Sequence, residues 1–522
     1  MHSESQSTGA PSPGTGIAGF EAGAPPLERG LRLTSRDGLN PYQSDGHWLL
    51  RMSPSGDYYA EDNWAFSFTE RAARRAPSLI IELDFLDEGF GVIAARRLAD
   101  ASFNGHYVEP SQAVSYTRLN TGRFRRAAFA FDEGPAGTDP EGKADLLFTG
   151  VQHLRSIRVF EHVPDSYWDQ LRGEIPEDVA PLVSLQHPMQ VVCSADGALS
   201  GMREDLRRSR HALRESLPLV KGLGFNAVES YVRWNLVEPE PGRFDWSIYD
   251  AIVEDLQRHG LKWFPLLVVG SAYTLPEWFH DSGQNVGFTC LEHGLSNPIQ
   301  SIWSPHHKQH VTRFLHAFGR HYEPLKCLQG VRLGPTGNFG ESQYPAGGNW
   351  GYHGEPMHIH IGMWAGDAYA RAHFRQVLRQ RYGSIEELNR AWHSQFARFL
   401  DIEPLLPDQC VSKRQRFDLN AWYTDSMTEW CAWWAHQARE AMPNTPIFQS
   451  SGGWGATEIG TDYSAQTRTM REIGGRQNDG SPSRNDFAGI RLTNELDSFH
   501  QCFYATRLAA TAARLYLSLI HI

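Results

Sequence analysis

The sequence has few of the features that mark several large classes of protein. Its 522 residues contain six cysteines, scattered without a Cys-x-x-Cys pair, so reduced thiols are expected rather than a disulfide framework. No stretch approaches the roughly 20 apolar residues that a membrane span needs. The first residues lack a basic segment followed by an apolar one, so no secretory signal is indicated and we expect a cytoplasmic protein.

Positive charge is also scarce. The chain has 49 Lys and Arg residues against 60 Asp and Glu residues, a net charge of −11, without a long basic run. Binding to nucleic acid therefore has little electrostatic support. The sequence contains no G-x-S-x-G, no H-E-x-x-H and no Gly-rich phosphate loop opening a helix. The serine-hydrolase, zinc-protease and nucleotide-binding classes therefore lack their residues, and we expect no cofactor. Aromatic residues are abundant instead, with 16 Trp and 18 Tyr, which fill a core or offer flat surfaces for sugars.

Hydrophobic patterning divides the chain into three parts. Residues 1–27 are rich in Ser, Gly, Pro and Ala and predict a disordered tail. Residues 28–175 contain short, often alternating segments separated by turn residues, which predicts a β-sandwich accessory domain. In residues 176–522 helical stretches alternate with six apolar strands, expected at 188–194, 225–234, 262–270, 328–335, 445–451 and 487–495, which predicts a (β/α)8 barrel. Because the last helical stretch, 502–517, ends without a cap, we expect a fragment in which the barrel is incomplete at its C-terminus.

Polar and aromatic residues gather where barrel strands are expected to end, the positions that form the active site of such a fold. At the first of these strand ends, Arg233 and Trp234 are followed by Glu-Pro, a Pro-Gly turn and Phe-Asp-Trp. The string over 234–246 resembles the W-x-x-x-E-P-x-x-G-x-F-D-W signature of clan-A glycoside hydrolases, above all the family 42 β-galactosidase group, with a weaker likeness to family 35. Residues 367–396 resemble a helix pair of family 42 as well, which speaks for the family but not for a mechanism.

The next two strand ends supply further candidates. Trp278 stands in a Pro-x-Trp loop that resembles the loop lining the sugar pocket in these families. Beyond the following strand, a Gly-rich loop carries Asn338, Glu341, Tyr344 and Trp350. A strand-end carboxyl that is withdrawn from water can serve as a general acid. In the resembled families the acid stands at this fourth strand, usually directly after Asn.

Glu341 departs from that pattern because it follows Gly340, with Asn338 three places earlier. The Gly-Pro-x-Gly string before it, and the Tyr-Pro after it, also resemble the β-amylases. The departure puts the subfamily and the substrate in doubt, while Glu341 remains the best candidate for the acid.

A glycosidase of this type needs a second carboxylate. Glu495, beside Asn494, ends the sixth apolar strand, whereas the nucleophile of the resembled families belongs to the seventh. Glu495 is therefore a substrate-binding residue, with the nucleophile beyond residue 522, or it is the nucleophile itself if one strand within 355–445 has been overlooked.

Histidines near the glycine-rich loop that carries Glu341, called the acid loop below, raise the question of a metal. His353, His358 and His360 stand close to Glu355, and a His-x-His pair in a strand points both rings one way. Histidines in loops beside sugar pockets are commoner, so we expect no metal.

The resemblance implies hydrolysis of a β-glycosidic, above all a β-galactosidic, bond with retention. Glu341 would act as acid and then base, and Arg233, Asn338 and Asn494 would hold sugar hydroxyls. Trp234, Trp278, Tyr344 and Trp350 are the aromatic candidates for the sugar pocket. The expected partner is an oligosaccharide or β-galactoside, and a homo-oligomer is left open. Two alternatives remain: an inverting β-amylase-like hydrolase, and a catalytically inactive carbohydrate-binding protein.

Overall fold

The structure of the chain is a computed structural model. It describes residues 16–34, 39–52, 63–69, 75–100, 106–134, 144–177, 179–180, 182, 192–194, 206–346, 357–452, 458–474, 488–492, 499–516 and 519–521. The chain divides into two compact units, one made of residues 1–191 and 205–226 and the other of residues 192–204 and 227–522. None of the helices in the described part of the chain has the length and apolar character that a membrane crossing requires.

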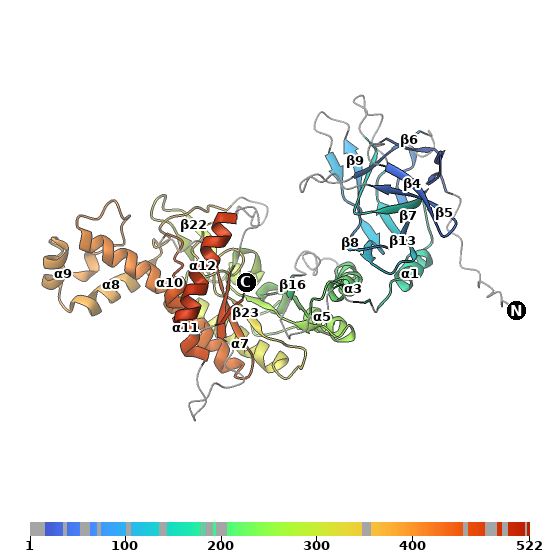
Figure 1. Cartoon of the computed structure of the whole chain (residues 1–522). Helices are drawn as coiled ribbons and strands as arrows, with labels where there is room; N and C mark the ends of the chain where they lie inside the picture. The colour runs from blue at the N-terminus through green and yellow to red at the C-terminus, as the bar shows by residue number, and fades with distance from the viewer. Residues whose placement is uncertain are drawn as a thin grey trace. The chain divides into compact units, whose positions relative to one another are not determined.

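The first unit is built from antiparallel strands in two large sheets (Figure 1). The larger sheet follows the order β11 (Gln112–Val114), β13 (Phe124–Phe131), β7 (Leu79–Leu86), β15 (His153–Phe160), β1 (Ala18–Glu21) and β2 (Leu27–Arg29), with β5 (His47–Met52) on β15 and β4 (Leu39–Ser44) on β5. The other follows the order β10 (His106–Val108), β9 (Ala94–Asp100), β14 (Leu146–Thr149), β6 (Asn63–Phe68) and β3 (Leu31–Leu33). A small pair joins β12 (Thr117–Leu119) to β8 (Phe90–Val92).

The two large sheets share one hydrophobic core. Alternate residues of β7, from Leu79 to Phe85, pack with Phe129 of β13 and with Trp64 and Phe66 of β6. Strand β7 is buried along its whole length, because its other face lies in a second cluster with helix α1 (Asp165–Gly173). Helix α3 (Leu206–Gly222) belongs to the same unit and contacts β8 and β12.

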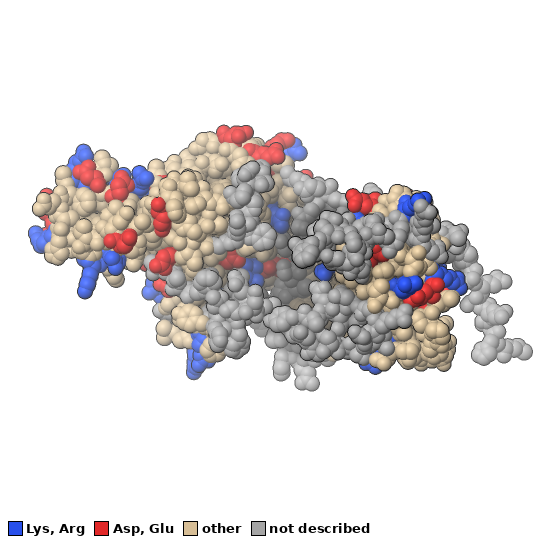
Figure 2. All heavy atoms as spheres, turned by 90° about the horizontal axis from the view of Figure 1, so that it is seen from above, with Lys and Arg blue, Asp and Glu red and all other residues tan. Residues whose placement is uncertain are grey.

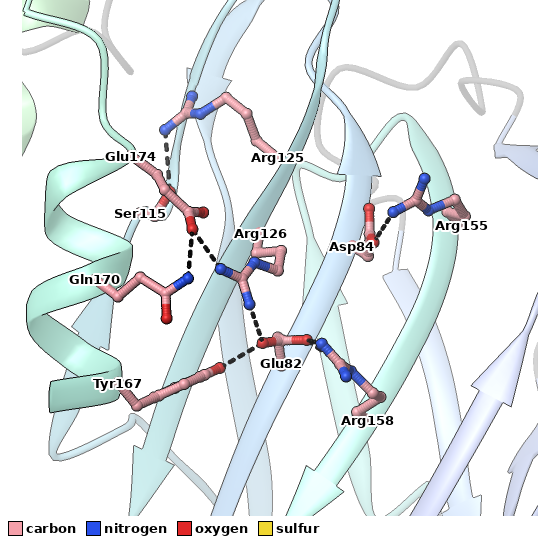
Figure 3. A network of polar contacts seen from close by, with 10 residues as sticks. All are labelled: Glu82, Asp84, Ser115, Arg125, Arg126, Arg155, Arg158, Tyr167, Gln170 and Glu174. Carbon is pink, nitrogen blue, oxygen red and sulfur yellow. Dashed lines mark hydrogen bonds and ion pairs between the residues drawn. The ribbon is translucent and has the colours of Figure 1, made fainter. Parts of the chain in front are cut away.

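Charged side chains between α1 and the sheet are paired (Figure 3). Glu82 of β7 accepts hydrogen bonds from Tyr167 Oη at 2.7 Å and from Arg158 Nε at 2.8 Å, and it forms an ion pair with Arg126 at 3.4 Å. Arg126 also pairs with Glu174, just beyond the helix. A buried carboxylate is tolerated only with such partners, so this network attaches α1 to the sheet.

The second unit is built on parallel strands. One sheet has the order β16 (Val192–Ser194), β17 (Ala227–Glu229) and β19 (Lys262–Trp263). The other has the order β18 (Tyr231–Arg233), β20 (Leu266–Val268), β23 (Val331–Gly334), β24 (Ile447–Ser451), β25 (Ala488–Leu492) and β26 (Leu519–His521). Strands β17 and β18 are successive parts of one extended segment, as are β19 and β20, so the described strands occupy seven successive parallel positions.

Helices separate these strands in the chain. They are α4 (Trp234–Val237), α5 (Ser247–Arg258), α6 (Glu277–His280), α7 (Pro305–Tyr322), α8 (Ala368–Tyr382), α9 (Ile385–Trp392), α10 (Lys413–Ala441), α11 (Tyr463–Gly474) and α12 (Phe499–Tyr516), with short 3-10 turns at Ala272–Thr274 and Phe399–Asp401. A hairpin of β21 (Gly287–Thr289) and β22 (Ser296–Gln300) precedes α7. Helices α10 and α11 contact β24 and β25 respectively (Figure 1). The predicted alternation of apolar strands and helices is confirmed for this unit.

The surface of the described residues shows no large patch of one charge on the face seen in Figure 2, where acidic and basic side chains are interspersed. Trp422, Trp430 and Trp434 of α10 are buried. Trp392 of α9 is buried too. These aromatic side chains belong to the packing of the second unit rather than to a sugar surface.

Candidate active site

Glu341 lies in the loop that follows β23, and its side chain is buried, with 3% of its surface exposed. The loop turns tightly because Gly337 and Gly340 adopt positive φ angles of 72° and 85°. A Cβ atom at Gly340 would lie 2.8 Å from the Cα of Gly334, so the loop also packs closely on the strand it leaves. The glycines of this motif therefore let the loop fold back onto the end of β23.

The neighbouring backbone fixes the loop from both sides. Ser342 N donates to Ser450 O of β24 at 2.9 Å, and Thr461 Oγ1 donates to Ser342 O at 3.1 Å. Before the glutamate, Trp430 Nε1 of α10 donates to Pro335 O at 2.8 Å. The loop of the acid candidate is thus fixed to α10 before Glu341 and to β24 after it.

Side-chain amides and hydroxyls continue this support. Gln466 Oε1 of α11 accepts from Ser342 Oγ, Gln449 Nε2 and Ser451 Oγ, each at 3.0 Å. All four side chains are buried. Because buried polar groups are costly when unpaired, this network gives the segment around Glu341 a defined position.

A buried ion pair lies next to the acid candidate. Arg332 of β23 donates from Nη1 to both carboxylate oxygens of Glu229, at 3.0 and 3.1 Å, and from Nε to Ser450 Oγ at 2.6 Å. Burial alone would lower the pKa of Arg332, but the attraction of Glu229 and then of Glu341 outweighs it, so the pKa of Arg332 is raised. Arg332 therefore remains a cation between two carboxyl groups.

A second arginine belongs to the same electrostatic group. Arg491 of β25 has a lowered pKa, first because of burial and then because of the repulsion of Arg332, while Glu229 and Glu341 oppose that shift. Two carboxyl groups and two guanidinium groups are thus brought together from strands β17, β23 and β25 and the acid loop. Such a site can exchange a proton with a bound oxygen and can bind hydroxyl groups through fixed donors.

Sequence reasoning did not identify Glu229, Arg332 or Arg491. Each stands inside a predicted apolar strand, where a charged residue is expected only if a partner lies opposite. A charged residue inside an apolar run was therefore the sign in the sequence that each of them has a partner. The partners could not be named, because Glu229 and Arg332 are far apart in the chain and meet only through the arrangement of the parallel strands.

The structure corrects the prediction for Trp234. Its ring is fully buried at the start of α4, and its Nε1 donates to Glu238 Oε2 at 2.6 Å. Glu238 also accepts from Gly242 N and pairs with Arg313. The W-x-x-x-E-P segment is therefore a turn stabilised by the hydrogen bonds and the ion pair of Glu238. Trp234 has no exposed face on which a sugar could stack.

Tyr344 is a second correction. It is fully buried, donates from its hydroxyl to Tyr423 O at 2.8 Å, and stacks on the Tyr423 ring with centroids 3.8 Å apart. Burial, and then the neighbouring Tyr423, raise the pKa of Tyr344 well above its ordinary range. Tyr344 packs against Tyr423 instead of lining a sugar pocket.

Three sequence candidates keep positions compatible with binding. Arg233 ends β18 half-buried, with its guanidinium 5.2 Å from the Tyr273 ring centroid. Asn338 is buried within the acid loop. Trp278 is half-buried, donates from Nε1 to Glu238 O at 2.9 Å and meets Trp234 edge-on. Their roles in sugar binding stay predictions.

The remaining candidates lie outside the described residues. They are Trp350, Asn494 and Glu495, together with His353 and Glu355 from the metal alternative. The other two histidines of that alternative, His358 and His360, are described, and they lie with Cys290 and His293, which the sequence did not single out.

Comparison with known proteins gives one family and several partial relatives. The model of glycosyl hydrolase family 14 matches residues 200–472. A β-amylase of Cytobacillus firmus is 27% identical over 210 residues, which cover 37% of this chain and 43% of that protein. The β-galactosidase BgaA of a Thermus species is 27% identical over 208 residues, which cover 37% of this chain and 26% of that protein.

Among solved structures, the catalytic domain of the β-amylase from Paenibacillus polymyxa has a TM-score of 0.48 and 17% identity, covering 59% of this chain and 80% of that one. The chain spans less than half the length of the two curated relatives named above.

Proposed function

This chain belongs to glycosyl hydrolase family 14, and from that premise we propose that it hydrolyses a glycosidic bond with Glu341 as the general acid. The observation that carries the proposal is the position of Glu341. It is the buried carboxyl group of a glycine-rich loop that follows a parallel strand, fixed against the next strand and placed beside Arg332. It lies within the matched part of the chain.

The sequence resembled family 42 above all and the β-amylases more weakly. Because family 14 is the family matched, and a β-amylase is among the relatives, we propose an amylase-type substrate, a starch-like glucan. Glu341 would protonate the departing sugar oxygen while a second carboxylate activates water on the opposite face of the ring, with inversion. The guanidinium group of Arg332, held by Glu229, would fix the position of the acid relative to the bound sugar.

The second carboxylate is proposed to be a group other than Glu495. The described residues 357–446 are helical wherever they are regular, so they add no strand between β23 and β24. That supports the place of Glu495 after the sixth strand position. We therefore propose Glu495 and Asn494 as substrate-binding residues on a (β/α)8 barrel, and the first unit as an accessory β-sandwich.

A second candidate function is hydrolysis of a β-galactoside with retention. The similarity to the Thermus β-galactosidase favours it, and so does the family 42 resemblance of the segment around Trp234. The two functions differ in the sugar accepted and in the anomer released.

The test incubates the chain with maltoheptaose and, separately, with p-nitrophenyl β-galactoside. Proton NMR then records which anomer appears first. Hydrolysis of the glucan with inversion is expected, and Glu341→Gln should abolish it. Glu386→Gln, at an exposed position of α9, is the matched control and should leave the rate unchanged. Galactoside turnover with retention would favour the second function, whereas sugar binding without turnover of either compound would overturn the enzyme proposal for this chain.

A further inference from the structure

Four potential metal ligands gather in the second unit. Cys290 follows β21, and His293 lies in the turn before β22. His358 and His360 lie in the segment that leads into α8. One ligand atom of each side chain falls within 4.8 Å of all the others. Two separate loops therefore present one thiol and three imidazole rings to a common point.

The individual separations fit a tetrahedral ion. Cys290 Sγ lies 3.3 Å from His358 Nε2 and 3.7 Å from His293 Nδ1. With zinc bonds of about 2.3 Å to sulfur and about 2.0 Å to nitrogen, neighbouring ligand atoms of a tetrahedron are about 3.3–3.6 Å apart. The three imidazole centroids are 4.9–5.0 Å from one another, so the rings surround one point rather than stack.

The surrounding backbone indicates which ring nitrogen of His360 is available and holds the His358 loop in place. His360 Nδ1 lies 3.1 Å from Ile361 O, which leaves Nε2 facing the cluster, and that atom is buried without a hydrogen-bond partner. The carbonyl oxygen of His358 accepts from Asn297 Nδ2 at 2.8 Å, which holds its loop against β22. A hydrogen bond that orients the second ring nitrogen is typical of histidines that bind metals.

A thiol–imidazole nucleophile is a poorer explanation. Cys290 is buried, with 1% of its surface exposed, so a substrate could not reach its sulfur. An ion could still enter the cluster from the side of His293, because that residue is exposed.

We propose that Cys290, His293, His358 and His360 bind one Zn²⁺ ion as a closed structural site. One thiolate and three imidazoles form a ligand set that zinc accepts, and four protein ligands leave no open position for catalysis. The ion would tie the β21–β22 turn to the segment before α8. His360 N also donates to Pro345 O at 3.3 Å, so the same segment touches the chain just beyond the acid loop.

The test measures zinc in the purified chain by elemental mass spectrometry after dialysis. About one zinc per chain is expected, and Cys290→Ala and His360→Ala should each reduce it severalfold. Cys410→Ala and His436→Ala are the matched controls, since both residues lie outside the cluster, and they should keep the wild-type zinc content.

Cobalt substitution keeps the proposal testable if a variant folds poorly. The wild-type chain loaded with Co²⁺ should show a thiolate-to-cobalt charge-transfer band and the strong visible bands of a tetrahedral ion. Removing the ion with a chelator should lower the melting temperature of the wild-type chain but not that of His360→Ala. The proposal is overturned if the folded wild-type chain takes up no zinc or cobalt, or if Cys290→Ala retains the charge-transfer band.

Discussion

At the scale of single residues, Glu341 is tightly packed. Gly452, which follows β24, faces its side chain, and a Cβ atom there would lie 2.7 Å from both Cβ and Cγ of Glu341. The glutamate therefore occupies a place that only glycine at position 452 leaves open.

Substituting Gly452 by alanine should displace the acid without removing it. Gly452 does not have a positive φ angle, so alanine strains the contact and not the backbone. We expect kcat/KM to fall about 100-fold, the effect of misplacing a catalytic group by about 1 Å. Steady-state kinetics with the substrate that the chain accepts measure this fall in kcat/KM. Gly283→Ala, in open space, is the control, and an unchanged rate in Gly452→Ala would contradict the packing described here.

The pair of Glu229 and Arg332 makes a second prediction. Arg332→Met leaves the buried Glu229 carboxylate without the guanidinium group that donates to both its oxygens, so the free energy of unfolding should fall by about 3–5 kcal/mol. Replacing both residues by methionine removes the uncompensated charge and should recover most of that loss. Urea denaturation of the two variants compares them. An Arg332→Met chain as stable as the wild type would show that the ion pair is not formed.

Residue-scale prediction from sequence was limited by what the spacing of residues can show. Glu341 became the acid candidate because a glycine-rich loop after an apolar strand restricts where a carboxyl group can lie, and its role stays a prediction. Trp234 and Tyr344 were assigned to a sugar pocket because an aromatic residue at a strand end can face either way. Their partners, Glu238 and Tyr423, decide the direction, and neither pairing follows from spacing alone.

At the scale of elements, helix α3 carries a carboxyl group with an unusual environment. Glu215 is buried against the Ser115–Tyr116 backbone, from which it accepts hydrogen bonds. Burial outweighs these bonds and raises the pKa of Glu215 from 4.5 to about 7. The folded unit therefore retains a proton that the unfolded chain has already released.

This shift predicts a loss of stability with rising pH. Between pH 4.5 and about pH 7 the folded state binds more protons than the unfolded state, so the free energy of unfolding should fall by about 3 kcal/mol over that range. Glu215→Gln should remove this dependence, while Glu161→Gln, an exposed carboxyl, should not. Hydrogen exchange of peptides from α3 and β8 measures this pH dependence of the stability. Equal pH dependence in the wild type and Glu215→Gln would refute the assignment.

Elements were easier to predict than their contacts. Asp367 accepts from the amides of Tyr369 and Ala370 at the start of α8, and Gly383 ends it with a positive φ angle, so local signals mark both ends of the helix. The strands could be recognised because buried parallel strands form continuous apolar runs. The breaks between β17 and β18 and between β19 and β20 have no such local signal.

At the scale of the whole molecule, the chain joins an antiparallel unit to a parallel α/β unit, and the matched family covers mainly the second. The aromatic surplus of the sequence divides between packing helices such as α10 and the region around Trp278. The hydrolase proposal therefore depends on one loop of the second unit, and on Glu341 as the proposed proton donor.

The most direct test of that claim compares leaving groups. Wild-type chain and Glu341→Gln are assayed on two glycosides of the sugar that the chain accepts, one with a sugar leaving group and one with an activated nitrophenolate. If Glu341 protonates the leaving oxygen, its loss should slow cleavage of the sugar–sugar bond about 10²–10⁴-fold and slow release of the nitrophenolate far less. Equal rate losses on both substrates, or none on either, would contradict the assignment of Glu341 as the general acid.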